Sequence, residues 1–323
     1  MKYELIISGG EKVFSPAVVD GIEWTASRSG AAGKLTFSII RDNKCLPDEG
    51  NKVTLCVDGK GVFCGYIFSL DWNKEGVISV VAFDQLRYFK NKETYIYSGR
   101  TAESVLKMIA ADFGMKIGEI ADTGYVIPSR VEDNKQLFDI VGNAIDLTYQ
   151  NTGKLYILYD DFGKISLKNT ADMVVKSGSE ILFFDENSAE DYEFSSDINN
   201  TFNKIKLVRE NKKTASREVF CESDSDNIRK WGTLQYYAKL SADENGKEKA
   251  KSLLNLYNSR SRSLKLKNAV GDVRVRGGSM VGVSLEMSGI KTKEFMLVES
   301  VRHVFRENEH LMTMDLRGGD ING

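Results

Sequence analysis

Nucleophilic and metal chemistry have few suitable residues in this chain. It has only two histidines, His303 and His310, and its serines Ser15, Ser27 and Ser29 lack a GxSxG context. The histidines fall on an expected hairpin that turns near Asn308. They would not be directly opposed there, and we expect them at the surface or at an interface. The four cysteines form no CxxC pair, so a zinc site is not expected; they are Cys45, Cys56, Cys64 and Cys221.

Phosphate and acid–base chemistry are no better supported. Gly33-Lys34 resembles part of a phosphate-binding loop, but Leu35 stands where Ser or Thr is needed and Arg28 where the first glycine belongs. Asp160-Asp161 is the most conspicuous pair of carboxylates. Adjacent strand residues point to opposite faces, and turn residues are often acidic for local hydrogen bonding. We therefore predict no catalytic, cofactor-binding or metal-binding residues and no cofactor, and the protein is not expected to be an enzyme.

Four aromatic residues between positions 149 and 162 leave two interpretations open. They could stack on a sugar or a base, but core and cross-strand packing is the commoner use of such residues. The residues are Tyr149, Tyr156, Tyr159 and Phe162.

The composition is that of an ordinary globular protein of about two domains. The chain has 323 residues, is 41% hydrophobic and carries a net charge of −2, which is too balanced for a dedicated nucleic-acid binder. Its longest nearly apolar run, 77–83, is far too short to span a bilayer, so no membrane insertion is expected. Glu4 interrupts the first apolar stretch, so we expect no signal peptide. We expect synthesis in the cytosol, where the thiols would be reduced and buried. A disulfide between Cys56 and Cys64 across a hairpin is the less favoured alternative.

Strand patterns dominate residues 1–95. Residues 35–39 and 53–57 alternate, and Asp58-Gly59 turns the chain into the strand 62–70. The unbroken apolarity of 77–83 predicts a strand buried on both faces. These features indicate a compact antiparallel β-domain, either a small barrel or a sandwich.

Helical patterns interrupt the strands twice. A helix is expected to begin at Thr101 and end at Gly114, and a second to begin with a capping box formed by Asp133 and Gln136; the two should pack together. A β-hairpin over 155–167 completes a small α+β unit spanning about 98–180. A third helix is expected from Ser241 to about Asn258, opened by a Ser241–Glu244 capping box.

The two β-rich ends of the chain share a strand order. Gly50-x-x-Val53, a turn and a strand to Leu70 correspond to Gly278-x-x-Val281, a turn and a strand to Val301, and each then closes with a partner strand. We interpret this as an internal duplication of one β-fold. The second copy is expected to start near 202–207 and to be interrupted by the third helix.

Charge is unevenly distributed along the second half. Residues 172–197 are strongly acidic and 260–276 strongly basic. Both could be solvated surfaces, or they could meet across a subunit interface or line a channel. The basic residues alternate with apolar ones, so each basic pair should decorate one face of its strand. These residues are Lys265, Lys267, Arg274 and Arg276.

Several short stretches together resemble the XkdQ/YqbQ-like proteins of contractile phage tails and of the prophages and bacteriocins derived from them. The resemblance covers most of the chain and is weakest over 170–260. The stretches are WTASR (24–28), GAAGKLTF (30–37), GYIF (65–68), AFDQLRY (82–88), DLTY (146–149), TGKLY (152–156), Gly271-Asp272, Gly277-Gly278 with Val281, and Val301-x-His303-x-Phe305 leading to His310.

The resemblance implies an α+β, mainly β fold with two related antiparallel β-barrel domains, a small α+β domain and a helical insertion. The expected domains are a first barrel over 1–97, an α+β domain over 98–180 with two helices and a hairpin, and a second barrel over 181–323 interrupted by a helical insertion at about 216–261. Three such chains would present six similar modules to a hexameric tail tube while keeping threefold symmetry towards a trimeric spike.

The function so implied is a structural baseplate hub, similar to the hub part of type VI secretion spikes. The expected partners are itself as a homotrimer, the tail tube protein, the central spike protein, and baseplate wedge and LysM-type baseplate proteins. DNA or a tape-measure protein could pass through the ring. The hub would assemble in the bacterial cytoplasm and reside in the tail of a virion or tail-like particle. The alternative is a tail-associated peptidoglycan-degrading or carbohydrate-binding protein.

Overall fold

The computed structural model describes all residues except 11, 43–45, 212–215, 241–244, 288–289 and 319–323. The N-terminal strands follow the order β3-β4-β7-β6-β5-β1-β2, with every neighbouring pair antiparallel, and enclose one apolar core. Their bounds are β1 (Tyr3–Gly9), β2 (Lys12–Phe14), β3 (Val18–Ser27), β4 (Lys34–Ile40), β5 (Lys52–Val57), β6 (Lys60–Trp72) and β7 (Val77–Phe83).

Strand β7 differs from the prediction in its burial. Ile78, Val80 and Ala82 are buried, whereas Ser79 is exposed and the other residues are half-buried. The expectation of burial on both faces was wrong, because this antiparallel sheet covers a core on one side only.

The α+β unit has its own core. Its elements are η1 (Gln85–Lys90), β8 (Lys92–Arg100), α1 (Ala102–Asp112), β9 (Ile117–Ile120), β10 (Ile127–Gln136), α2 (Leu137–Thr152), β11 (Tyr156–Asp160), β12 (Ile165–Asn169) and η2 (Thr170–Met173). The predicted start of α1 at Thr101, the packing of α1 on α2 and the hairpin of β11 and β12 are confirmed.

The capping box at Asp133 and Gln136 was wrong. Strand β10 continues to Gln136, which pairs with Lys92 of β8, and α2 then begins at Leu137 without a side-chain cap. Pairing with a strand 44 positions earlier makes these residues extended instead of helical, and the local sequence gives no sign of this pairing.

The C-terminal strands follow the order β16-β20-β23-β22-β21, again antiparallel, and β15 joins β21 in parallel. Their bounds are β15 (Phe183–Phe184), β16 (Asp191–Asp197), β20 (Ser261–Val270), β21 (Met280–Met287), β22 (Ile290–Phe305) and β23 (His310–Gly318), preceded by the small pair β13 (Lys176–Ser177) and β14 (Glu180–Ile181). They surround a separate apolar core.

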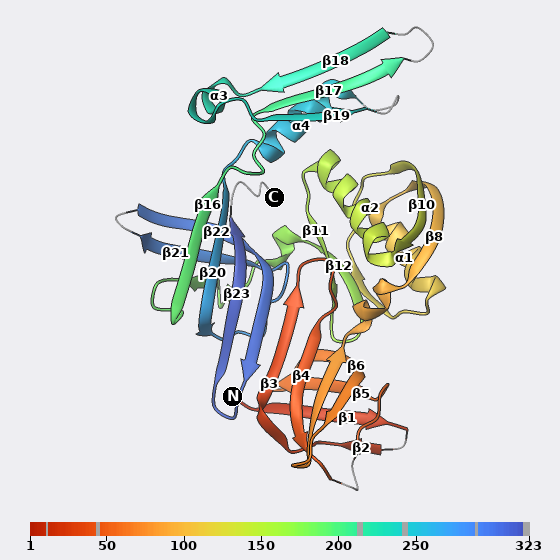
Figure 1. The fold of residues 1–323 in the computed structure, drawn as a ribbon, viewed down its shortest axis with the longest axis vertical. Coiled ribbons are helices and arrows are strands. Elements are labelled where there is room, and N and C mark those ends of the chain that lie inside the picture. Colours follow the sequence, from red (N-terminus) through yellow and green to blue (C-terminus); the bar gives the residue numbers. More distant parts are fainter. Residues whose placement is uncertain (11, 43–45, 212–215, 241–244, 288–289, 319–323) are drawn as a thin grey trace.

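Between β16 and β20 the chain forms a separate three-stranded sheet, which lies at one end of the long axis of the molecule (Figure 1). It contains β17 (Lys204–Asn211), β18 (Ser216–Ser223) and β19 (Gln235–Lys239), with α3 (Ser225–Trp231) and α4 (Gly246–Tyr257). The insertion predicted as helical at 216–261 is therefore also β-structured. The start of the second copy at 202–207 was wrong, because β17 pairs with β18 and β19 and, among the described residues, with no strand of the second copy; the copy begins with β16.

The third helix is confirmed as α4, with Ala250 and Leu253 buried. It is capped by Asn245, whose side chain accepts a hydrogen bond from the Glu248 N–H. The predicted Ser241–Glu244 capping box lies outside the described residues.

The internal duplication holds at the level of strand register. Strands β3, β4, β7, β6 and β5 of the first copy correspond in order and direction to β16, β20, β23, β22 and β21. In the first copy Ile67 pairs with Ala82, which pairs with Leu35; in the second Val298 pairs with Leu316, which pairs with Leu264. Both copies interrupt the ladder at the next residue, between 67 and 69 in β6 and between 298 and 300 in β22.

Two equivalent glycines show the same correspondence in backbone hydrogen bonds. The Gly50 N–H donates to the Ile67 carbonyl at 2.8 Å, and the Gly278 N–H donates to the Val298 carbonyl at the same distance. Both glycines have positive φ, +83° and +93°, a conformation that costs other residues free energy. A shared bulge and a shared left-handed turn in one register indicate a common β-module.

The two modules are joined edge to edge. Residues 300–305 of β22 pair antiparallel with 22–27 of β3, so one sheet runs through both copies (Figure 1). Within the described residues the strand pairs follow an open order from β16 to β2, and closure of each copy into a barrel is not confirmed. The mainly β character is confirmed.

The equivalent glycines offer a matched test of the duplicated turn. A Cβ on Gly50 would meet open space, whereas on Gly278 it would lie 2.5 Å from Cγ2 of Ile157. We expect Gly50→Ala to cost about 1 kcal/mol of unfolding free energy through backbone strain, and Gly278→Ala at least twice as much because it adds a clash. Urea unfolding of both variants measures this, and equal losses would contradict it.

Candidate functional site

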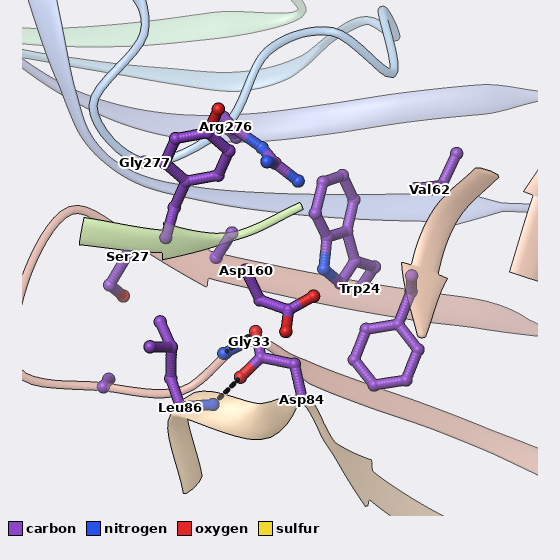
Figure 2. A pocket seen from close by; sticks show the side chains of 13 residues that line it. Trp24, Ser27, Gly33, Val62, Asp84, Leu86, Asp160, Arg276 and Gly277 are labelled. Atoms are coloured by element: carbon purple, nitrogen blue, oxygen red, sulfur yellow. Dashed lines mark hydrogen bonds between the residues drawn. The ribbon is translucent and has the colours of Figure 1, made fainter. Parts of the chain in front are cut away.

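A pair of buried carboxyl groups lies where the first copy, the second copy and the α+β unit meet. Asp84 follows β7 and precedes η1, while Asp160 ends β11, and their side chains point towards each other beside Trp24 of β3 (Figure 2). The second copy contributes Arg276 and Gly277 from the loop between β20 and β21. Residues from four separate parts of the chain thus converge at one point.

Backbone N–H groups hold both carboxyl groups in place. Asp84 accepts hydrogen bonds from the N–H of Gly33 at 2.8 Å and of Leu86 at 3.0 Å, the latter as the N-cap of η1. Asp160 accepts from the Gly163 N–H at 2.6 Å, and from the Gln85 side chain at 3.4 Å. The Asp84 carboxylate therefore ties the start of η1 to the loop before β4.

Burial makes ionisation of both groups unfavourable. It raises the pKa of Asp84 well above its usual range, and the neighbouring Asp160 charge raises that pKa further. Burial likewise raises the pKa of Asp160, to about 6, against the lowering effect of its hydrogen bonds and of Arg276. At neutral pH the pair consequently stores unfavourable electrostatic free energy.

Arg276 covers this site from the second copy. Its guanidinium lies 5.8 Å from the ring centre of Trp24 and 4.7 Å from that of Tyr159, and 3.9 Å from an oxygen of Asp161. The cavity between these side chains measures about 20 Å³, room for one water molecule. A site of this size holds structural elements together and admits no organic substrate.

The predicted acid pair Asp160-Asp161 does not converge. Asp160 is buried beside Asp84, whereas Asp161 is exposed and faces Arg276. The Gly33 N–H is used by Asp84, which is consistent with the rejection of a phosphate loop at Gly33-Lys34. Sequence reasoning missed the pairing of Asp84 with Asp160; the available signal was an Asp directly after an apolar strand, a common N-cap position.

His303 departs from the expected surface position, whereas His310 is half-buried. As predicted, they are not directly opposed on the hairpin, since Phe305 faces His310. His303 is nevertheless fully buried, stacked on Trp24 with ring centres 4.8 Å apart. Its Nε2 lies 2.9 Å from the Val275 carbonyl and must donate there, so its Nδ1 accepts from Nε2 of His310 at 2.9 Å.

The thiols follow the register of the first hairpin. Cys56 pairs with Gly61, and Cys64 with Thr54, so the two cysteines are not opposite each other and both are free. Cys64 is buried as expected and its pKa is raised by burial, whereas Cys221 is exposed, contrary to the expectation. Cys45 lies outside the described residues.

The four aromatic residues do not form one binding platform. Tyr156 is buried in the core of the α+β unit, and Tyr149 and Tyr159 pack on a different apolar cluster. The ring of Phe162 lies against Gly61 of β6, where a Cβ would approach it within 2.6 Å. Packing, the commoner use, therefore accounts for these residues.

A larger open cavity of about 380 Å³ lies between α2, α4 and the second copy. Its walls include Arg28, Tyr149, Tyr257 and Arg317, and Asp146 is the single carboxylate among the described residues that line it. Glycoside hydrolysis ordinarily requires two carboxylates flanking the bond to be cleaved. This cavity lacks that arrangement.

The acidic and basic blocks meet within one chain. Strand β16 pairs with β20, and Lys267 binds the carboxylates of Asp191 and Glu193. The placement of Arg274 and Arg276 on a strand face was wrong, because both lie in the loop before β21, where Arg274 binds Asp272. Ion pairing across neighbouring strands accounts for this part of the charge pattern.

The part of the chain that the structure describes offers neither a metal-binding cluster nor a membrane-spanning helix. No group of three or more His, Cys, Asp or Glu side chains there could hold a metal ion. No helix of that part of the chain is both long and apolar enough to cross a bilayer.

The chain belongs to the YQBQ-like family, whose model matches residues 22–317. It is 32% identical to the uncharacterised protein YqbQ of Bacillus subtilis (strain 168) over 95% of this chain and 92% of that protein. It is 31% identical to protein XkdQ of the phage-like element PBSX from the same organism, over 83% and 81% of the two chains. The predicted XkdQ/YqbQ-like resemblance is thereby confirmed.

The fold is shared with solved tail and secretion-system proteins. The 43 kDa tail protein of prophage MuSo2 from Shewanella oneidensis superposes with a TM-score of 0.68 at 14% identity, over 97% of this chain and 98% of the other. The E. coli c3393 protein, a component of the type VI secretion system, gives a TM-score of 0.59 at 9% identity, over 99% and 78%. The chain therefore has the fold of a phage tail protein.

Replacing Asp160 by Asn tests the cost of the buried acid pair. The raised pKa of Asp160 means that its ionisation disfavours folding above about pH 6 and that this penalty fades as the pH falls towards 4. We expect Asp160→Asn to be more stable than the parent by about 1 to 2 kcal/mol in urea unfolding at pH 7.5, and equal to it near pH 4. The exposed neighbour variant Asp161→Asn should show neither effect, and a less stable Asp160→Asn at pH 7.5 would refute the argument.

The buried His303 and the half-buried His310 should give the opposite pH dependence. Burial lowers the pKa of His303 to about 3 and that of His310 to about 4, so the unfolded chain binds protons near pH 6.5 that the native protein does not. The stabilising contribution of His303 is complete above pH 6.5, and about 2 kcal/mol of it is lost by pH 5. We expect His303→Gln to lose correspondingly less stability between pH 7.5 and 5, with Glu75→Gln as an exposed control that follows the parent.

Proposed function

We propose that this protein is a structural baseplate hub of a contractile phage tail or tail-like particle. In this proposal three chains form a ring that joins the hexameric tail tube to the trimeric spike and anchors the surrounding baseplate. The ring acts mechanically, by nucleating tube assembly and holding the spike, and no catalytic turnover is involved.

The observation that carries the proposal is the internal duplication. Each chain contains two β-modules with one strand order, one register and one bulge position, joined in a single sheet. Three such chains present six similar modules, which suits a sixfold partner on one side, while their true symmetry remains threefold for a trimeric partner on the other. Family membership and the shared fold of tail proteins support the same role.

The remaining parts of the chain have proposed places in this assembly. The two ring modules, each a β-barrel, are residues 1–97 and 181–323. The α+β domain is residues 98–180. This domain and the insertion between β16 and β20 face the wedge and LysM-type baseplate proteins. The tube and spike proteins bind opposite faces of the ring. DNA or a tape-measure protein passes through its lumen, and the protein resides in the particle's tail after assembly in the bacterial cytoplasm.

Mass measurement under assembly conditions tests the proposal. We expect purified protein, alone or with its tube or spike partner, to form a species of three times the 36.1 kDa chain mass. Light scattering or mass photometry over a range of concentrations measures it. Absence of a trimer at every accessible concentration, with and without partners, would refute the hub assignment.

A peptidoglycan zymogram separates the hub from the alternative enzyme. The proposal predicts no cleared band, whereas a tail-associated hydrolase would clear one.

A further inference from the structure

The junction between the two modules leaves its counterpart edges unused. One edge of β22 has two partners within the chain. Its earlier residues, 290–297, pair with β21, and its later residues, 300–305, pair with β3. In the first copy the same edge of β6, at residues 69–72, has no strand partner among the described residues. Strand β16, the counterpart of β3, is the outermost strand of the sheet, and its other edge has no partner in the part of the chain that the structure describes.

Because the two copies share one register, each residue pair of the β22–β3 junction has an equivalent pair between β6 and β16. Trp72 is the counterpart of His303, because they pair with the equivalent residues Ile78 and Met312. Phe194 is the counterpart of Trp24, because each pairs with the equivalent leucine, Leu264 or Leu35.

His303 pairs with Trp24 in the internal junction. The same rule therefore places Trp72 opposite Phe194. It also gives the pairs Ser69 with Asp197, Leu70 with Ser196 and Asp71 with Ser195.

The aromatic residues of the internal junction are buried, whereas their counterparts on the two open edges are more exposed, as expected if a partner strand is missing there. In the internal junction both His303 and Trp24 are buried and stacked at 4.8 Å. Among the described residues their counterparts make no aromatic stack: the Trp72 side chain, with the Arg41 guanidinium 5.9 Å from its ring centre, is 50% exposed, and Phe194 is only partly buried. An exposed Trp at the end of an open strand edge is a feature of interfaces rather than of free surfaces.

We propose that residues 69–72 of one protomer pair antiparallel with β16 of the next protomer, repeating between chains the β22–β3 junction found within each chain. The occupant of the edge is thus a second copy of this protein. The contact is heterologous, so every chain uses both edges, and the ring closes when the last chain meets the first. This inference rests on the proposed function for the number of chains, three.

The charges along this edge are compatible with the pairing. The carboxylates of Asp191 and Glu193 on β16 are already bound by Lys267 of the same chain. Asp71 would face the neutral Ser195, whose hydroxyl lies 2.7 Å from that of Ser263. In this register no two carboxylates are directly opposed.

Cysteine cross-linking of the full chain tests the register. Directly opposed residues on neighbouring strands have Cα atoms about 4.5 to 5.5 Å apart, within the range of a disulfide. A chain carrying Asp71→Cys and Ser195→Cys, with the exposed Cys221 replaced by Ser, should give covalent dimers and trimers on a non-reducing gel after oxidation with diamide. We expect at least tenfold more product than from the Cys221→Ser parent.

An out-of-register control keeps the test specific. The chain with Asp71→Cys and Asp191→Cys places the second thiol four residues away on the same strand, so it should remain at the parent level. In addition, Trp72→Ala should raise the concentration needed for trimer formation about tenfold or more, as loss of a central aromatic residue does at other interfaces. Ile96→Ala, at an exposed position of β8, is the matched control and should have no effect.

The outcomes separate this inference from the proposed function. A trimer by mass without in-register cross-linking, or with equal cross-linking of the control, would overturn the strand pairing and leave the hub assignment standing. Absence of both trimer and cross-linking would overturn the two together. Selective cross-linking at Asp71 and Ser195, with weakened assembly of Trp72→Ala, supports the pairing.

Discussion

The backbone pairing of β22 with β3 is the contact on which the rest of the structure depends. It joins two modules, each with its own apolar core, into one continuous sheet. The stack of His303 on Trp24 closes the junction on one face, and the Val275 carbonyl fixes the tautomer of His303 from the adjoining loop. Because strand pairing fixes both distance and register, the two modules have one defined relation to each other.

The buried acid pair belongs to the same junction. Arg276 lies over Trp24 on one side and near the Asp84–Asp160 cavity on the other, so the second copy covers the point where the first copy meets the α+β unit. Buried carboxyl groups reduce stability at neutral pH, yet their hydrogen bonds to Gly33 and Gly163 orient the segments that carry them. The arrangement favours a unique orientation of three units over maximal stability.

The sequence comparison of the two copies succeeded where local signals and core packing coincide. Alternating apolar residues identified β4 and β5 of the first module, and Gly50 and Gly278 marked the turn shared by both modules, because a positive φ favours glycine. It failed at β16 and β17: the segment 202–207 has a strand pattern, but nothing local says that its partners are β18 and β19 instead of β20. Assignment to a sheet is decided by partners distant in the chain.

The sequence alone determined the mainly β character, the family, the helices α1, α2 and α4, and the presence of a duplication, since periodicity and turn residues act over short distances. Only the tertiary structure decided where the acidic and basic blocks meet, that His303 is buried, and that Asp84 and Asp160 share one cavity. These features come from segments tens of residues or more apart, brought together by sheet order and burial, and single-chain patterns do not encode which distant segments will be neighbours.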